Sequence, residues 1–422
     1  MKARYQYRIY PRPNQIAPLA KAFGCARVVW NDALVIFLNE EKPKLAGANR
    51  RFGETSAVSR PRLSPCERRA FPKDVDKRVI TQAKKTQERC WLSEVSNIVL
   101  QQSYRDLLTA WSNYFSSLNG KRKGKKVGRP KFKKKQSRQA IRFRKGGFTV
   151  HSCSVKLAKI GHIPIEFSRP LPTNPSSVTI IKDCAGRYFA SFVVEIIPEA
   201  LAESEGSIGI DLGLTHFAIL SNSEKIENPR LHKKRLHRIK RANKKLSRCH
   251  NGSNRRQRAK LKLAKLHAKV KDSRADFLHK LTTRLVRENQ ALAIEDLNVS
   301  GLVKNRRLSR AISDAGWYKF RQLLIAKCDK YDRKLVVISR WEATSQKCSN
   351  CGFRGGKKEL NVREWTCLSC NSHHDRDICA ANNILVAGGL SETQNGRRRE
   401  CKTSLLAVPV EPSTAYKQLT LF

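Results

Sequence analysis

The sequence has 422 residues, 40% of them apolar, so the chain is long enough for two or three domains with cores of their own. Its 85 Lys and Arg against 35 Asp and Glu give a formal net charge of +50, which indicates a polyanionic partner, most commonly nucleic acid. The absence of any run of 18 or more apolar residues argues against a membrane protein, and the N-terminus lacks an apolar signal-peptide core. We therefore expect a cytoplasmic, nucleoid-associated protein.

The first predicted element is a strand. Residues 3–9 alternate apolar and polar side chains and are followed by Pro11 and Pro13, which predicts a half-buried strand that ends there. Short apolar runs with turn signals between them return over 140–196. Together these segments predict a small β-barrel that the first strand completes.

Helices are predicted between these strands. Apolar residues recur at helical spacing over 16–37 and again over 95–118, and a polar, Pro-rich stretch lies at roughly 42–73. We expect the helices to form one bundle inserted in the barrel. The basic stretch over 120–135, "GKRKGKKVGRPKFKKK", is either a solvated linker or a loop that contacts phosphates, and the charge of the chain favours the loop.

The C-terminal half is predicted to begin after a change of composition over 198–206. The stretch 231–270 holds sixteen Lys and Arg and no acid, which predicts basic helices that break near "HNGSN" at 250–254. Leucines between the basic residues argue against a disordered tail there. The residues after roughly Gly388 are polar and have no period, so they are interpreted as a tail.

Four of the thirteen cysteines form a pattern. Cys348 and Cys351 are followed, after fifteen residues, by Cys367 and Cys370, which is the spacing of a four-cysteine zinc ribbon. Gly352 permits the left-handed turn that such a knuckle needs. Because the region has too few apolar residues for a core, metal binding must supply its folding energy. We predict structural Zn²⁺ here, and reduced thiols at the nine scattered cysteines.

Three carboxylates stand out in a chain with few acids. Asp211 interrupts the apolar run 207–220, Glu295 ends the apolar run of 291–298, and Asp377 starts a predicted helix rich in small residues. Each alone is more often a solvated strand end or a helix cap than a catalyst. Taken together, the order strand Asp, strand Glu, helix Asp favours a nuclease in which carboxylates converge on two Mg²⁺ ions.

Neighbouring residues have weaker signals. Asp375 is interpreted as a residue that supports a metal ligand or forms a turn, with direct ligation as the alternative. His373 and His374 could bind zinc, but four cysteines already suffice, so both are predicted to be loop residues.

The chain resembles the TnpB family, the RNA-guided nucleases encoded by insertion-sequence transposons and related to type V CRISPR effectors. The resemblance extends over nearly the whole length and is most specific in "GIDLGL", "DFLHKLT", "IEDLNVSGLVKNRRLSRAISDAGW", "SQKCSNCG" and "HDRDICAANNI". It implies a multidomain α/β and β-barrel protein: a RuvC-like nuclease of RNase H fold with an inserted zinc ribbon, and a wedge-type barrel interrupted by a helical recognition bundle. The implied domains are the barrel at 1–12 and 125–203, the bundle at 13–124, the nuclease at 204–342 and 373–388, the ribbon at 343–372 and a tail at 389–422.

By the same resemblance, the catalytic triad and Mg²⁺ ligands are Asp211, Glu295 and Asp377. The family pattern Asp-x-Asn-Ala-Ala-x-Asn-Ile is kept at Asn383, but Cys379 stands where the first Asn is expected. The implied function is a transposition-associated, RNA-guided, Mg²⁺-dependent DNA endonuclease. Its partners would be a guide RNA, with one protein per guide, and double-stranded DNA bearing a short flanking motif, without a membrane.

Three alternatives remain at this stage. The first is a catalytically impaired, RNA-guided DNA-binding repressor, for which Cys379 is the supporting feature. The second is a transposase that acts directly in strand transfer. Such an enzyme would need a tyrosine nucleophile with a pair of histidines, and the sequence has no histidine pair of this kind beside a tyrosine. The third is a zinc-ribbon nucleic-acid-binding protein of the ribosomal or transcriptional kind, which leaves the three carboxylate motifs unexplained.

Overall fold

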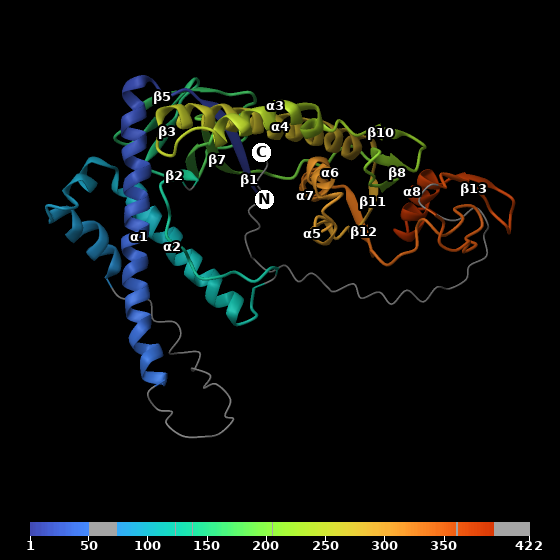
Figure 1. Ribbon diagram of the computed structural model, residues 1–422, viewed down its shortest axis with the longest axis horizontal. Coiled ribbons are helices and arrows are strands. Elements are labelled where there is room, and N and C mark those ends of the chain that lie inside the picture. The colour runs from blue at the N-terminus through green and yellow to red at the C-terminus, as the bar shows by residue number, and fades with distance from the viewer. Residues whose placement is uncertain (50–73, 123, 137, 205, 360–361, 392–422) are drawn as a thin grey trace. The chain divides into compact units, whose positions relative to one another are not determined.

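The computed structural model describes all residues except 50–73, 123, 137, 205, 360–361 and 392–422 (Figure 1). Most of the polar stretch predicted over 42–73 and of the tail predicted over 389–422 lies outside the described residues. The chain divides into two compact units, one of Ala3–Glu195 and one of Met1–Lys2 with Ile196–Phe422. We call them the N-terminal and C-terminal units and describe each by itself.

The N-terminal unit contains a seven-stranded sheet in the order β2-β6-β7-β1-β5-β4-β3. Its first strand lies between β7 and β5, and Ile9 pairs with Ile165 of β5, so the start of the chain joins a sheet built from residues after 138. Closure of this sheet into a barrel stays a prediction. The strands are β1 (Lys2–Ile9), β2 (Gln139–Arg144), β3 (Phe148–Val150), β4 (Ser154–Leu157), β5 (Gly161–Glu166), β6 (Ser177–Lys182) and β7 (Tyr188–Glu195).

Two long helices pack together in this unit. They are α1 (Pro13–Asn49) and α2 (Asn97–Leu118), and between them lie the short turns η1 (Lys77–Gln82), η2 (Ala83–Lys85) and η3 (Cys90–Glu94). Trp111 of α2 is fully buried and stacks on Phe37 of α1 with ring centroids 5.8 Å apart. Helix α1 continues to Asn49, into the stretch predicted to follow it.

Helix α1 is also apolar enough to meet a membrane-span criterion. Among the described residues, one helical window, Pro13–Asn39, is long enough and has a mean hydropathy of 1.2. Half of that window is buried, and core helices of soluble proteins meet the same criterion. Leu19, Val29 and Leu34 have no or almost no exposed surface, so this face of α1 already contacts protein.

The basic loop over 124–135 is fastened to α1. The indole N–H of Trp30 donates to the carbonyl of Lys131 at 3.1 Å, and Asn31 exchanges two hydrogen bonds with the backbone of Lys133. The Lys133 ammonium lies 3.6 Å from the centre of the Trp30 ring. The loop is therefore held in place and is not a freely solvated linker.

The C-terminal unit contains a five-stranded sheet in the order β10-β9-β8-β11-β12. Strands β8, β11 and β12 are parallel, whereas β9 and β10 are antiparallel to their neighbours. The strands are β8 (Ser207–Asp211), β9 (His216–Leu220), β10 (Lys225–Glu227), β11 (Ala291–Glu295) and β12 (Lys334–Ile338). A separate small hairpin consists of β13 (Glu364–Thr366) and β14 (His373–Asp375).

Helices cover both faces of this sheet. Leu292 and Ile294 of β11 face a core shared with α4 and α7, whereas Ala293 between them packs against Ile384 of α8. Since side chains alternate along a strand, every second residue of β8 and β11 faces α8. The helices are α3 (Leu231–Ser247), α4 (Asn254–Glu288), α5 (Val299–Leu302), α6 (Ser309–Ala315), α7 (Trp317–Tyr331) and α8 (Arg376–Ala387).

Helices α3 and α4 form the basic hairpin, with the break at 248–253 that the sequence predicts. Asp314 of α6 anchors it, because its carboxylate accepts hydrogen bonds from the backbone N–H of His232 and pairs with Arg274 at 2.8 Å. The position at the start of α3 suits a carboxylate because the helix N-terminus carries partial positive charge.

Candidate active site and metal centre

Asp211 and Glu295 lie at the same edge and on the same face of the sheet. Each is the last residue of its strand, and Ile210 and Ile294 before them are register partners in the parallel pair β8–β11. Asp211 shares its face with Gly209, and Glu295 shares its face with Ala293, which packs against α8. Both carboxylates therefore point to the side of the sheet that α8 covers.

Helix α8 lies directly on β8 because residue 209 is glycine. A Cβ at Gly209 would stand 2.1 Å from the backbone oxygen of Ala381 and 2.9 Å from the backbone nitrogen of Leu385. The small side chains of Ala380 and Ala381 are buried in the same contact. This close approach brings Asp377, in the first turn of α8, beside Asp211, whose pKa its charge raises.

The helix cap is Asp375 and not Asp377. The Oδ1 atom of Asp375 accepts hydrogen bonds from the backbone N–H of Asp377 at 2.9 Å and of Ile378 at 3.1 Å, and its Oδ2 pairs with Lys225 of β10 at 2.5 Å. Asp375 thus fixes the start of α8 and joins it to the sheet. Among the described residues, the Asp377 carboxylate pairs with the exposed Arg363 at 3.4 Å, which leaves it a candidate metal ligand.

The protonation of this cluster is perturbed. Although Asp211 keeps some exposed surface, burial among protein atoms and, after it, the negative charges of Glu295 and Asp377 together raise its pKa to about 7. Burial also raises the pKa of Glu295, against the lowering effect of a hydrogen bond from Thr344. A divalent cation bound among these carboxylates would relieve their mutual repulsion, which makes the cluster a candidate metal site.

A pH dependence follows for the metal-free protein. Because the pKa of Asp211 is raised to about 7 in the folded state, its contribution to stability is full below about pH 4 and is lost as the pH rises through 7. Mg²⁺ binds the ionised form, so we expect the gain in Tm on adding Mg²⁺ to be larger at pH 8 than at pH 5. Thermal unfolding of the zinc-loaded protein measures this. An equal gain at both pH values, or a difference that survives in Asp211→Asn, would contradict the assignment.

Thr344 connects Glu295 to α8. Its hydroxyl donates to Oε1 of Glu295 at 2.6 Å, and its carbonyl accepts from the buried Asn383 side chain at 2.7 Å. Asn383 also donates to the carbonyl of Lys347 at 2.8 Å, and the Cys379 thiol, one turn earlier on α8, donates to that same carbonyl at 3.2 Å. Cys379 is therefore a packing residue of α8 whose contact is to the backbone just before Cys348.

Asp296, beside Glu295, is already neutralised. Arg321 and Arg340 both pair with its carboxylate and hold its pKa below the usual range. Glu295 is thus the carboxylate of this strand end that remains open to a metal.

The carboxylate set is more open than a single-ion site. Within the part of the chain that the structure describes, the four ribbon cysteines are the only group of three or more candidate ligands whose atoms all lie within 4.8 Å of one another. Oxygens of Asp211, Glu295 and Asp377 are therefore spread more widely.

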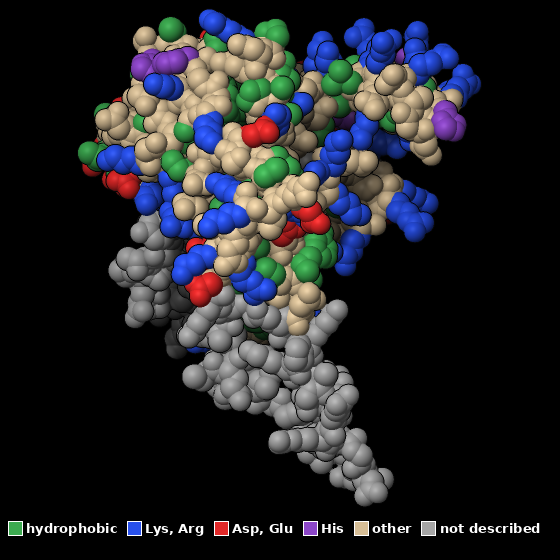
Figure 2. Space-filling view, turned by 90° about the vertical axis from the view of Figure 1, so that its left-hand side faces the viewer, with side chains coloured by type: hydrophobic (Ala, Val, Ile, Leu, Met, Phe, Trp, Pro, Cys, Tyr) green, Lys and Arg blue, Asp and Glu red, His purple; other side chains and the backbone are tan. Residues whose placement is uncertain are grey.

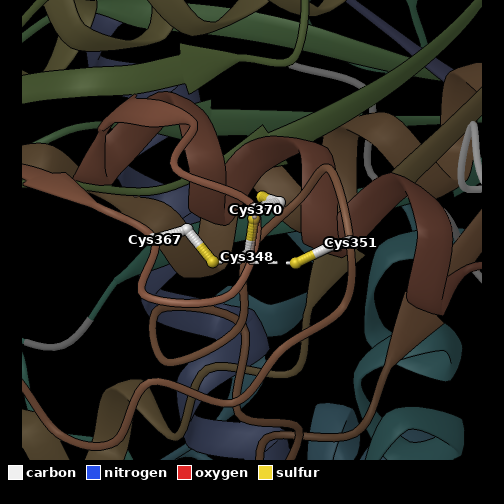
Figure 3. A group of neighbouring side chains, drawn as sticks. All are labelled: Cys348, Cys351, Cys367 and Cys370. Carbon is white, nitrogen blue, oxygen red and sulfur yellow. Dashed lines mark hydrogen bonds between the residues drawn. The ribbon is translucent and has the colours of Figure 1, made fainter.

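The four cysteines converge on one point (Figure 3). The sulfurs of Cys348 and Cys370 are 3.7 Å apart, and those of Cys351 and Cys367 are 3.6 Å apart. A tetrahedral zinc with Zn–S bonds of about 2.3 Å separates its sulfurs by roughly 3.8 Å, so the donor set fits Zn²⁺.

The two Cys-x-x-Cys turns have the same backbone conformation. Gly352 has φ +74° and donates its N–H to the carbonyl of Cys348, and Asn371 with φ +56° does the same for Cys367. Asn is the non-glycine residue that tolerates this conformation best. Along the chain the cluster lies between β12, which pairs with the strand of Glu295, and α8, which carries Asp377.

His374 corrects one prediction from the sequence. His373 and His374 are not loop residues but part of β14, and Nε2 of His374 lies 3.0 Å from the sulfur of Cys348. Its ring also packs on Trp365 of β13, with centroids 5.0 Å apart. His374 thus contacts the zinc centre directly.

Comparison with known proteins decides the family. A protein of Streptomyces pristinaespiralis named "Putative RNA-guided DNA endonuclease" is 40% identical over 98% of this chain and 97% of its own length. The chain belongs to the TnpB family. A second relative with that name, InsQ of Escherichia coli K12, is 29% identical over 72% of this TnpB chain and 78% of its own length.

Family profiles match three parts of this TnpB chain. Residues 191–306 match a family described as "Probable transposase", 317–384 match "Cas12f1-like, TNB domain", and 1–37 match "Helix-turn-helix domain". In 1–37 the structure has strand β1 and the first part of α1. Among solved structures, a Cas12f1–sgRNA–target DNA complex is similar with a TM-score of 0.44 and 12% identity, over 91% of this chain and 98% of that one.

Several residues that support this TnpB site could not be identified from the sequence. Thr344 lies in the loop before the first knuckle, 49 residues from its partner Glu295, and Lys225 is 150 residues from Asp375. No local sequence motif indicates that either of these two pairs comes into contact. Gly209 in "GIDLGL" and the alanines at 380 and 381 were the available signals for close packing of the helix on the strand.

The zinc centre is open to a direct test. We expect the purified protein to hold one Zn²⁺ per chain and Cys367→Ser to lose it, because the remaining three sulfurs cannot close the tetrahedron. Metal analysis by mass spectrometry measures the content. Cys153→Ser, at an exposed scattered thiol, is the matched control and should keep its zinc. Full zinc content in Cys367→Ser would refute the predicted ligand set.

Proposed function

We propose that this protein is an RNA-guided, Mg²⁺-dependent DNA endonuclease of a transposable element, with a RuvC-like nuclease of RNase H fold. The observation that carries the proposal is the convergence of Asp211 and Glu295, at the ends of adjacent parallel strands, with Asp377 at the start of the helix that covers them. An acidic cluster in a chain of net charge +50 is a place where metal ions can meet a polyanion.

Asp211, Glu295 and Asp377 would hold the Mg²⁺ ions. When bound, a pair of such ions activates water and stabilises the leaving oxygen in phosphodiester hydrolysis. The protein supplies the support: Thr344 orients Glu295, Asp375 fixes the helix that carries Asp377, and Gly209 sets the distance between helix and strand.

The basic surfaces would hold nucleic-acid backbones. The hairpin α3–α4 borders a cavity of about 940 Å³ whose lining includes Arg238, Arg241, Lys244, Lys245, Arg248, Arg255 and Lys262. Figure 2 shows Lys and Arg spread over one face of the molecule, with few Asp and Glu. Charges placed in this way bind phosphates without reading sequence.

The domains, partners and location follow the family. We assign a wedge-type barrel to 1–12 and 125–203, a recognition bundle to 13–124, a nuclease to 204–342 and 373–388, and a zinc ribbon to 343–372. One protein would bind one guide RNA in the cytoplasm, at the nucleoid. Base pairing would then read a double-stranded DNA target beside a short flanking motif.

The affinity of these basic surfaces for duplex DNA should depend steeply on salt concentration. The logarithm of affinity falls with the logarithm of salt concentration by about 0.9 for each neutralised phosphate of duplex DNA. We expect Lys244→Gln and Lys262→Gln each to reduce that slope by about 1. Lys280→Gln is the control, because its ammonium pairs with Asp276 at 3.0 Å. Filter binding over a salt series measures the slopes, and a nearly flat dependence would rule out a backbone-binding role.

The function itself is tested by purifying the protein from cells that carry its flanking DNA and sequencing the RNA bound to it. That complex, with Mg²⁺, is then given plasmids that carry the guide-matched target beside randomised flanks. Cleavage of plasmids that share one flank is the expected result. Absence of any specific RNA would overturn the proposal in favour of a zinc-ribbon binding protein.

A guided repressor is the second candidate, and the observation in its favour is Cys379 in place of the family Asn. Two results together would establish it: the unmodified protein binds targets with the right flank but does not cut them, and Cys379→Asn does cut them. Joined products in the same assay would instead indicate a transposase that transfers strands.

A further inference from the structure

An exposed tryptophan lies beside the candidate carboxylates. Trp341 is 87% exposed and is located in the loop that follows β12, at the sheet edge where Glu295 ends its strand. Register places Ile338, the last residue of β12, opposite Glu295. An exposed indole offers a flat apolar face on which another ring can stack.

The loop that carries Trp341 is fixed to the site at both ends. Arg340, immediately before it, pairs with Asp296, and Thr344, three residues after it, donates to Glu295 at 2.6 Å. Glu342 pairs with Lys347, so the loop is also joined to the start of the ribbon. These contacts hold the loop that carries the exposed Trp341 ring next to Glu295.

A second exposed aromatic residue is connected to the loop of Trp341. Tyr318 is 67% exposed and precedes Arg321 by three residues on α7, so the two occupy one side of that helix. Arg321 shares Asp296 with Arg340. Two exposed rings and two arginines therefore border the acidic cluster, which is the composition of surfaces that bind single-stranded nucleic acid by stacking.

We propose that Trp341 is a stacking platform for a base of the single-stranded DNA that enters the carboxylate site. Unpaired bases expose their faces, whereas bases in a duplex are already stacked on each other. A base stacked on Trp341 would hold its strand at the edge of the sheet where Glu295 lies. The inference rests on the proposed nuclease function and names the residue that would position a strand at its site.

The test compares two probes that differ in their bases and not in their charge. Oligothymidylate and an abasic strand of the same length are titrated into the Asp211→Ala protein, at raised salt where phosphate binding contributes least. We expect oligothymidylate to bind about 5- to 100-fold more tightly than the abasic strand. Trp341→Ala should abolish this preference and leave the affinity for the abasic strand unchanged, whereas Trp341→Phe should keep most of it.

Leu368→Ala is the matched control, since Leu368 is 89% exposed on the ribbon and should not affect the preference. Equal affinity for both probes in the protein with Trp341, or a preference that survives Trp341→Ala, would overturn the platform. Because these titrations need neither cutting nor a guide, they separate the two proposals. A Trp341-dependent preference in a protein that never cuts would refute the nuclease alone.

Discussion

Asp211→Ala is expected to abolish DNA cleavage while the protein still binds its guide RNA and target. Asp211 ends β8 at the centre of the three carboxylates, and its removal deletes a ligand that no other described residue at this position replaces. Loss of one metal ligand costs several kcal/mol of transition-state stabilisation, so we expect the single-turnover rate to fall by at least about a thousandfold. Plasmid cleavage measures the rate, and gel shift with the same target measures binding.

Asp276→Ala is the control for this variant, because Asp276 is an exposed acid of α4 that pairs only with the neighbouring Lys280. It should cut at the rate of the unmodified protein. Residual cleavage by Asp211→Ala above a tenth of that rate would show that the metal is held elsewhere. Loss of target binding together with cleavage would indicate a folding defect instead.

Gly209→Ala is expected to destabilise the C-terminal unit through one added methyl group. The new Cβ would lie 2.1 Å from a backbone oxygen of α8, which cannot rotate away as a flexible side chain can. Helix α8 must therefore shift from β8, and overpacking of this kind costs roughly 3 kcal/mol. In a unit of this size we expect Tm to fall by about 6–12 °C. Because the shift also moves Asp377, the cleavage rate should fall about a hundredfold or more.

The matched control is Gly128→Ala, since a Cβ at Gly128 has no neighbouring atom within 4 Å. That variant should keep the Tm and the cleavage rate of the unmodified protein. Calorimetry and plasmid cleavage on the two variants decide the matter. If Gly209→Ala melted and cut like Gly128→Ala, the contact of α8 on β8 would be looser than the structure has it.

The four-cysteine cluster and the elements that carry the carboxylates could be predicted because their determinants are local. Two Cys-x-x-Cys pairs specify their own turns, and apolar runs that end in Asp211 and Glu295 identify two buried strands. Asp375 was harder, since either aspartate of "DRD" could have capped α8, and the cap is decided by which carboxylate reaches the free N–H groups.

Contacts between distant segments could not be predicted in the same way. The hydrogen bond from Thr344 to Glu295 depends on the order of strands in the sheet, which a single sequence does not specify. His374 was assigned to a loop because four cysteines complete a tetrahedron, yet a neighbouring side chain can still contact a sulfur. The geometry around a metal centre includes residues that its ligand count does not require.

The position of Asp377 on α8, after the zinc ribbon, sets an order of events during synthesis. The basic hairpin α3–α4 and the strands with Asp211 and Glu295 leave the ribosome before the ribbon and α8 do. A growing chain therefore presents its basic hairpin before Asp377, the third candidate carboxylate, has been synthesised. In the proposed nuclease, the metal site would therefore be the last part to be completed, after the basic hairpin that would bind RNA.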